Sequence, residues 1–202
     1  MIIIILASLI IFCSLLSMQL KRNKKENKET EQSFWNREHK ANSVRKKPLD
    51  DLDYITIPMD RFPTALLRDD TYINDCIETL ETLSGQPIVN FTGYSNTDLK
   101  LEYGTANITV LTEYDQNYTT LVRTLQKWAD LLLEKGCSAE AEILMEYAVS
   151  IRTDISKTYY KLAEIYAVRL ENERVQKLIE TAEALRSANK NVIVRTLRES
   201  YL

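Results

Sequence analysis

A sequence repeat in the C-terminal third of the chain is the feature that most restricts its fold. Shifting Trp128-Ala129 by 34 positions gives Leu162-Ala163, so a large apolar residue and a small one recur in the same order. The same shift pairs apolar residues at seven further positions: Leu125 with Tyr159, Leu132 with Tyr166, Ala141 with Val175, Leu144 with Leu178, Met145 with Ile179, Ala148 with Ala182, and Ile151 with Leu185. A period of this length is typical of helix–turn–helix units, which stack and bury a shared core.

Within residues 122–189, each unit is predicted to be a pair of antiparallel helices. Its apolar residues recur every three or four positions, which is the spacing of one helix face. Gly136 is expected to form the turn of the first unit, and alanines are expected where the two helices approach each other closely. A bulky side chain at Ala148 would overpack that contact and destabilise the fold by about 1–3 kcal/mol.

This pattern of residue sizes resembles the tetratricopeptide repeat family over about residues 122–189, a third of the chain. The small residues of the family are matched at Ala129, Ala141, Ala148, Ala163 and Ala182. The second unit departs from the family at Leu170, which replaces glycine, and at Val175, which replaces alanine. Thr153 and Ser187 stand where the family has a closing proline. The resemblance implies an all-α, right-handed stack of helical hairpins. The alternative is a pair of generic hairpins whose sequences agree by chance.

Two repeats need neighbours, because each unit buries its apolar face on the next one. Residues 48–121 are expected to pack on one side of the repeats. They begin with an extended segment over 48–58, followed by an amphipathic helix over 70–84. Gly85 is expected to end that helix in left-handed backbone, and residues 85–104 are expected to form an ordered loop.

Further helices are predicted beside the repeats. A short one is expected over 97–103, and a second starts at Thr105 and runs toward the first unit, with a break near Asp115 as an alternative to continuity. On the other side, residues 190–202 are predicted to form a capping helix, because apolar residues share one stripe of it: Ile193, Val194 and Leu197.

The first twenty residues predict a transmembrane anchor. Residues 2–20 contain no charge, and as a helix they would extend about 28 Å, close to the roughly 30 Å thickness of a bilayer core. Five Lys/Arg follow between positions 21 and 28, and positive residues beside a membrane helix stay in the cytoplasm. We therefore expect residues 1–20 to span the plasma membrane once, with the C-terminal domain cytoplasmic. A cleaved signal peptide is disfavoured because no basic start precedes the apolar run and the run is too long. A lipoprotein signal at Cys13 is disfavoured because Phe12 stands before it, where such signals need a small residue.

Residues 21–47 are predicted to be a basic, disordered linker. They carry ten Lys/Arg against four Asp/Glu, a net charge of +6, whereas the rest of the chain carries 16 against 25, a net charge of −9. The segment has no apolar period. Its cations either set the topology or also bind anionic lipid headgroups. The aromatic pair Phe34-Trp35 either enters the membrane interface or packs on the domain.

A partner-binding groove is implied by the resemblance, because ligands of the tetratricopeptide repeat family lie along the first helix of each unit. The corresponding positions in this sequence are Arg123, Gln126, Asp130, Lys157, Tyr160 and Glu164. Some members of the family clamp a C-terminal carboxylate with lysine and asparagine. Asp130 and Glu164 would repel such a carboxylate, so that specificity is not expected here. A solvated face of mixed charge is the alternative interpretation.

The sequence offers no basis for catalysis. It has no glycine-rich phosphate loop and no serine-nucleophile motif, and His39 is its only histidine. Its three cysteines are far apart, which does not support a zinc site. An acidic body disfavours nucleic acid as a partner. We therefore expect no enzyme, no catalytic residue, no metal, no cofactor, no nucleic acid and no small-molecule substrate.

These observations together predict a membrane-anchored adaptor that presents a cytoplasmic surface to a protein or peptide partner. Two alternatives stay open: an obligate assembly or stability subunit of a membrane complex, and an exported binding protein. The chain is similar to single-span, membrane-anchored helical-repeat proteins of bacteria, from which no activity is carried over.

Overall fold

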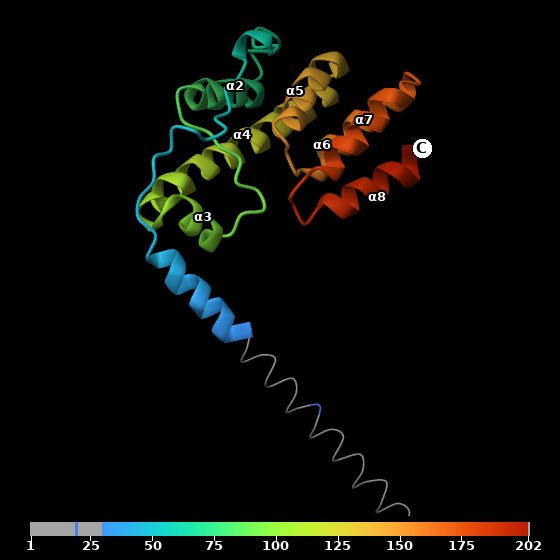
Figure 1. The fold of residues 1–202 in the computed structure, drawn as a ribbon. Helices are drawn as coiled ribbons and strands as arrows, with labels where there is room; N and C mark the ends of the chain where they lie inside the picture. Colours follow the sequence, from blue (N-terminus) through green and yellow to red (C-terminus); the bar gives the residue numbers. More distant parts are fainter. Residues whose placement is uncertain (1–18, 20–29, 202) are drawn as a thin grey trace, which may run out of the picture. The chain divides into compact units, whose positions relative to one another are not determined.

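The computed structural model describes Gln19 and residues 30–201, and no strand occurs among them apart from an isolated β-bridge between Tyr54 and Val89. The described part of the fold is therefore all-α, as the sequence predicts (Figure 1). It divides into two compact units. The first comprises residues 30–47 with Asn96–Asn107, and the second comprises Pro48–Ser95 with Ile108–Leu202.

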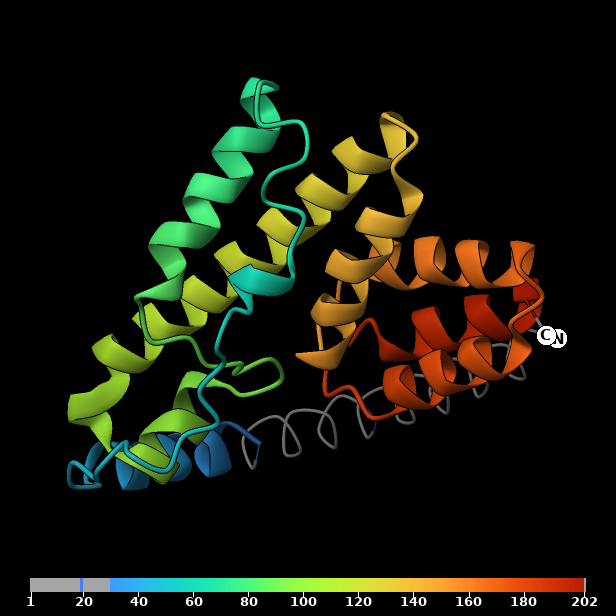
Figure 2. The same cartoon turned by 90° about the horizontal axis from the view of Figure 1, so that it is seen from above.

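The second unit is a series of helices that pack in chain order. They are η1 (Met59–Arg61), α2 (Thr71–Ser84), α4 (Ile108–Glu134), α5 (Ser138–Ser150), α6 (Ser156–Val168), α7 (Asn172–Glu183) and α8 (Lys190–Tyr201). Helix α2 packs on α4, α4 on α5, and α5 on α6, while α6, α7 and α8 pack on one another (Figures 1 and 2). The α4–α5 and α6–α7 hairpins are the two units that the sequence repeat predicts.

The turn inside each hairpin repeats with the sequence. Gly136 ends the α4–α5 turn with a φ of +78°, and Leu170 takes the same left-handed conformation in the α6–α7 turn with a φ of +60°. Each turn is closed by the same backbone hydrogen bond of 2.9 Å: Cys137 N–H to the Leu132 carbonyl, and Glu171 N–H to the Tyr166 carbonyl. The two donors are one repeat period apart, and so are the two acceptors, so the period describes backbone geometry as well as side-chain size.

The connection after each hairpin also repeats. The Thr153 hydroxyl oxygen accepts a hydrogen bond from the Ile155 N–H at 3.3 Å, and the Ser187 hydroxyl oxygen accepts one from the Asn189 N–H at 3.1 Å. Such side-chain acceptors support a turn before a helix. Thr153 and Ser187, which are one repeat period apart, therefore share one structural role.

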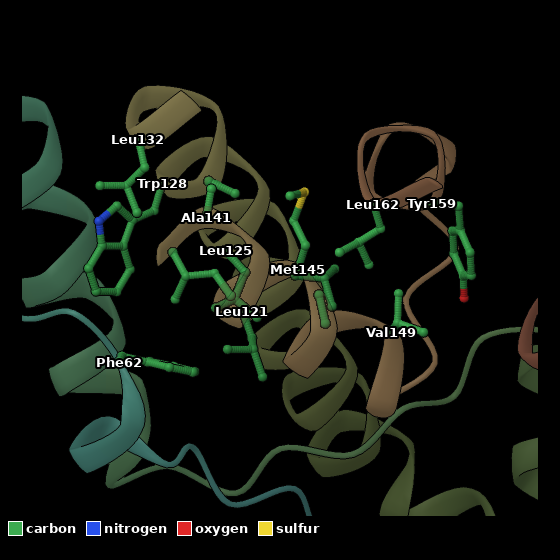
Figure 3. Close-up of a cluster of buried hydrophobic side chains, with 14 of the residues drawn as sticks. Phe62, Leu121, Leu125, Trp128, Leu132, Ala141, Met145, Val149, Tyr159 and Leu162 are labelled. Atoms are coloured by element: carbon green, nitrogen blue, oxygen red, sulfur yellow. The ribbon is translucent and has the colours of Figure 1, made fainter. Parts of the chain in front are cut away.

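The core follows the repeat closely. Of the nine pairs of equivalent residues, every member is buried except Ile151, which is half-buried. Leu125, Trp128 and Leu132 of α4 lie in one buried cluster with Ala141 and Met145 of α5 and with Phe62 (Figure 3). Phe62, just after η1, meets the Trp128 ring edge-on with 6.1 Å between the ring centroids, so the segment before α2 covers this part of the core.

Helix α8 occupies the position of the first helix in a third helical repeat. It begins one repeat period after α6, and two of its residues, Ile193 and Leu197, occupy the positions of Tyr159 and Ala163 with no exposed surface. The positions of Leu162 and Tyr166 are taken by small polar residues, Thr196 and Ser200. This polar replacement removes the apolar face on which a further helix would pack, as a cap requires.

The loop over residues 85–95 ties the ends of the two hairpins together. The Asn90 side-chain amide donates a hydrogen bond to the Ile151 carbonyl at 3.1 Å, at the end of α5. Beyond the end of α7, the Arg186 guanidinium donates to the Tyr94 hydroxyl at 2.6 Å. A Cβ at Gly93 would lie 2.7 Å from the Arg186 Cβ, so a glycine is needed for this close approach.

The prediction of a disordered linker over 21–47 is wrong for the described residues of that segment, which belong to the first unit. Residues 30–42 are helical and pack beside α3 (Asn96–Tyr103) and η2 (Thr105–Asn107). The contacts are largely polar: Glu38 pairs with Lys100 at 3.0 Å, and Arg37 pairs with Asp98. Because these partners lie about sixty positions apart in the sequence, no apolar period reveals them.

Three further predictions are resolved. Helix α2 follows the expected 70–84 helix, and the Asp70 carboxylate caps it by accepting hydrogen bonds from the Tyr72 and Ile73 amides. The prediction of left-handed backbone at Gly85 is wrong. The φ of Gly85 is −90°, so the chain turns there without a left-handed residue. Helix α4 is continuous through Asp115, so the helix before the repeat and the first helix of the repeat are one.

The predicted anchor at residues 1–20 lies outside the described residues, apart from Gln19, and so does the part of the predicted linker over 21–29. Among residues 30–201, no helix has both the length and the apolar character needed to cross a membrane. The anchor therefore stays a prediction from the sequence.

Candidate functional site

The six predicted groove residues lie on two helices with different surroundings. Helix α4 carries Arg123, Gln126 and Asp130, and α6 carries Lys157, Tyr160 and Glu164. Arg123, Lys157 and Glu164 are exposed, and Asp130 and Tyr160 are half-buried. Gln126 is only 8% exposed, so it is a poor candidate for contact with a partner.

Three of these residues form a polar connection between α4 and α6. The Lys157 amine pairs with the Asp130 carboxylate at 2.8 Å. The Gln126 amide donates a hydrogen bond to Asp130 at 2.9 Å and accepts one from the buried Thr158 hydroxyl at 2.5 Å. The hydrogen bonds satisfy the buried amide, and they fix the separation of the first helices of the two hairpins.

A hollow of about 560 Å³ opens next to this connection. Its lining comes from the last turns of α4, the first residue of α5 and one side of α6: Asp130, Leu133, Glu134, Ser138, Lys157, Lys161, Glu164, Ile165, Val168 and Arg169. Three of the six predicted residues therefore line it, namely Asp130, Lys157 and Glu164. Arg123, Gln126 and Tyr160 are not part of the lining.

The apolar part of the hollow was not among the predicted site residues. Leu133 and Ile165 are half-buried, and Val168 is 81% exposed. A signal for it exists in the sequence, because Leu133 and Val168 lie outside the repeated set of apolar residues and so have no assigned place in the core. An apolar lining bordered by polar groups is the usual composition of a ligand or peptide site.

The basic groups around the hollow are already paired with carboxylates. Lys161 pairs with Glu164 at 2.8 Å, and this hydrogen bond raises the pKa of the Lys161 amine. Arg169 pairs with the buried Glu142 of α5 at 2.7 Å. Glu134 is exposed and has no ion-pair partner among residues 30–201. Glu134 is therefore the charge of the rim that has no ion-pair partner among those residues.

Metal-ligating and thiol groups of the described residues can be located as well. No group of three or more His, Cys, Asp or Glu suited to a metal occurs among the residues that the structure describes. Cys76 and Cys137 are free thiols. Cys76 is buried, and burial raises the pKa of its thiol, which makes it a weak nucleophile. Paired side chains and an apolar floor suit recognition of another chain.

Comparisons with family models, with curated proteins and with solved structures gave no match to this chain.

Proposed function

We propose that the chain is a membrane-anchored, tetratricopeptide-like adaptor that presents a cytoplasmic binding surface to a protein or peptide partner. The hollow lined by Leu133, Ile165 and Val168 is the observation that carries this proposal. It lies beside the first helices of both hairpins, where the family resemblance puts a partner, and it joins an apolar floor to a charged rim.

The tetratricopeptide-like, right-handed stack is supported by what recurs from the first hairpin to the second. Buried residues, the left-handed turn residue, the closing hydrogen bond and the hydroxyl acceptor after the hairpin all repeat at the interval of the sequence repeat. Agreement in all four features favours a repeat over two generic hairpins. The polar far face of α8 is consistent with the end of such a stack.

The anchor and its orientation rest on the sequence. The uncharged run over residues 2–20 and the cations that follow it favour a single span with the repeats in the cytoplasm. Protease treatment of right-side-out vesicles tests this orientation. We expect residues 48–202 to survive until the membrane is opened, and digestion from outside would favour an exported binding protein.

Site-directed photo-crosslinking in native membranes tests the adaptor function. Two exposed lysines of the second compact unit are compared: Lys157, which lines the hollow, and Lys177, on α7. Each is replaced by a photoreactive residue in the full chain. We expect a discrete protein adduct from position 157 and none from position 177. Equal labelling at both positions, or an adduct at 177 alone, would contradict the assignment of the hollow.

An obligate subunit is the second candidate. Leu170 and Val168 are more than four-fifths exposed, and an apolar surface of this kind is normally covered in a permanent complex. Purification of the full chain in mild detergent separates the two candidates. An adaptor stays monodisperse without its partner, whereas an obligate subunit aggregates until the partner is co-expressed.

A further inference from the structure

The α6–α7 turn carries an apolar residue where the fold needs none. Leu170 has a φ of +60° and is 83% exposed. Gly136, its equivalent in the first hairpin, forms the same turn with the same closing hydrogen bond. Left-handed backbone disfavours every residue with a Cβ, so leucine adds strain to a turn that glycine makes freely.

The Leu170 side chain does not contribute to the hydrophobic core. It does not belong to the buried cluster or to the half-buried side chains packed against it. Most of its apolar surface instead faces solvent, which also disfavours leucine. Strain that persists without a structural benefit is found preferentially at functional positions.

Leu170 directly follows Arg169, which lines the hollow. Val168, two residues earlier, is 81% exposed and lines the hollow together with Leu133 and Ile165. We call these four residues, Leu133, Ile165, Val168 and Leu170, the turn patch. Leu133 and Ile165 are half-buried, whereas Val168 and Leu170 are the two most exposed large apolar side chains of the described residues. Exposed apolar side chains next to a half-buried apolar floor suit contact with an apolar side chain of a partner.

Charge indicates what kind of partner fits the turn patch. Lys157, Lys161 and Arg169 are each paired with a carboxylate of the chain, which leaves Glu134 as the unpaired charge of the rim. The second unit as a whole carries 23 Asp/Glu against 15 Lys/Arg, a net charge of −8. Such a surface attracts cations, and it is repelled by the anionic headgroups of a cytoplasmic leaflet.

We propose that the turn patch docks a partner segment whose apolar side chains are flanked by lysine or arginine, with Leu170 as its main apolar contact. This inference rests on the adaptor function proposed above and adds the chemistry of the partner. It explains why a leucine occupies this exposed, left-handed position, which the packing of the fold does not explain.

The test measures peptide binding to the full chain reconstituted in phosphatidylcholine nanodiscs. The probe is a short dye-labelled helical peptide of alanine, leucine and lysine with its leucines on one face, and its twin has glutamate in place of lysine. Binding to empty nanodiscs is subtracted. We expect the lysine peptide to bind more tightly than the glutamate peptide, and Leu170→Gly to weaken that binding by about tenfold to a hundredfold, as loss of one buried leucine predicts.

The stability of the same variants makes the test specific. Leu170→Gly relieves the left-handed strain, so we expect its thermal midpoint to equal or exceed that of the wild type while its binding falls. Val168→Thr keeps the size of an exposed side chain and should also weaken binding without unfolding the chain. The control, Val192→Ala, removes apolar surface from α8 at a residue that is 49% exposed and should leave binding unchanged.

Three results would overturn the inference: no preference for the lysine peptide, undiminished binding by Leu170→Gly, or a lower thermal midpoint for that variant. The failure of this inference is distinguishable from failure of the adaptor function. An adduct from position 157 combined with full affinity of Leu170→Gly would leave the adaptor standing and remove only the role of the turn patch.

Discussion

Gly136 offers a direct measurement of backbone strain in the hairpin turn. Its φ is +78°, and a Cβ added there would have no atom within 4 Å. Alanine at this position therefore changes the backbone preference without losing a contact or creating a clash. Left-handed backbone disfavours a non-glycine residue by about 1 kcal/mol, so Gly136→Ala should lower the free energy of unfolding by about that amount.

The expected change is measurable by thermal unfolding. For a chain of this size, about 1 kcal/mol lowers the midpoint by about 2–4 °C. Trp128 is fully buried and Trp35 is 54% exposed, so a Trp35→Phe background makes the fluorescence report the second unit alone. The melts of Gly136→Ala and its parent are compared in that background.

Gly85→Ala is the matched control. Gly85 has an ordinary φ of −90°, and the nearest atom to an added Cβ is the Thr82 carbonyl oxygen at 3.9 Å. Alanine there restricts only the unfolded chain and should raise stability by about 0.4–1 kcal/mol. If both variants changed the midpoint in the same direction, or if Gly136→Ala matched its parent, the strain argument for the turn would be refuted.

Three further predictions concern other parts of the chain. Gly104→Ala would put a Cβ 2.3 Å from the Arg45 carbonyl oxygen, so hydrogen exchange across residues 45–47 should accelerate while the second unit keeps its midpoint. Ala148→Leu should overpack a site that is 2% exposed and cost about 1–3 kcal/mol, which urea titration of the Trp128 fluorescence checks. Burial raises the pKa of Asp115 above 3.8, so the folded state favours the protonated carboxyl. The stability that protonated Asp115 contributes is therefore lost as the pH rises through the folded pKa. Asp115→Asn should therefore gain more stability relative to wild type at about pH 7 than at about pH 3, and an equal difference at both would contradict this.

Burial in the two hairpins could be predicted from the sequence because it follows a local and periodic signal. Alanines 129 and 163 are small where helices meet, and the large residues beside them recur in phase, so their places in the core follow from spacing alone. The same reasoning predicted the Gly136 turn. It did not predict that Leu170 would adopt that conformation, because a leucine gives no local sign of left-handed backbone.

Polar contacts between distant residues explain what the sequence did not predict. Glu38 is fixed by Lys100, far along the chain, and no rule of spacing connects the two. The family resemblance implied a groove position for Gln126, but only the structure shows that Thr158 contacts Gln126 and that Gln126 is buried. The hollow depends in the same way on three helices meeting, so the face of each helix was predictable and the shape between them was not.

Hydrogen exchange of the full chain tests the central claim, that a partner occupies the hollow, most directly. Exchange is measured in native membranes with the partner present and again after purification in detergent. The account predicts slower exchange in the native membranes at residues 130–138 and 157–170, which contain the hollow and the α6–α7 turn. Unchanged exchange at these residues, with slowing confined to α2 or α7, would contradict it.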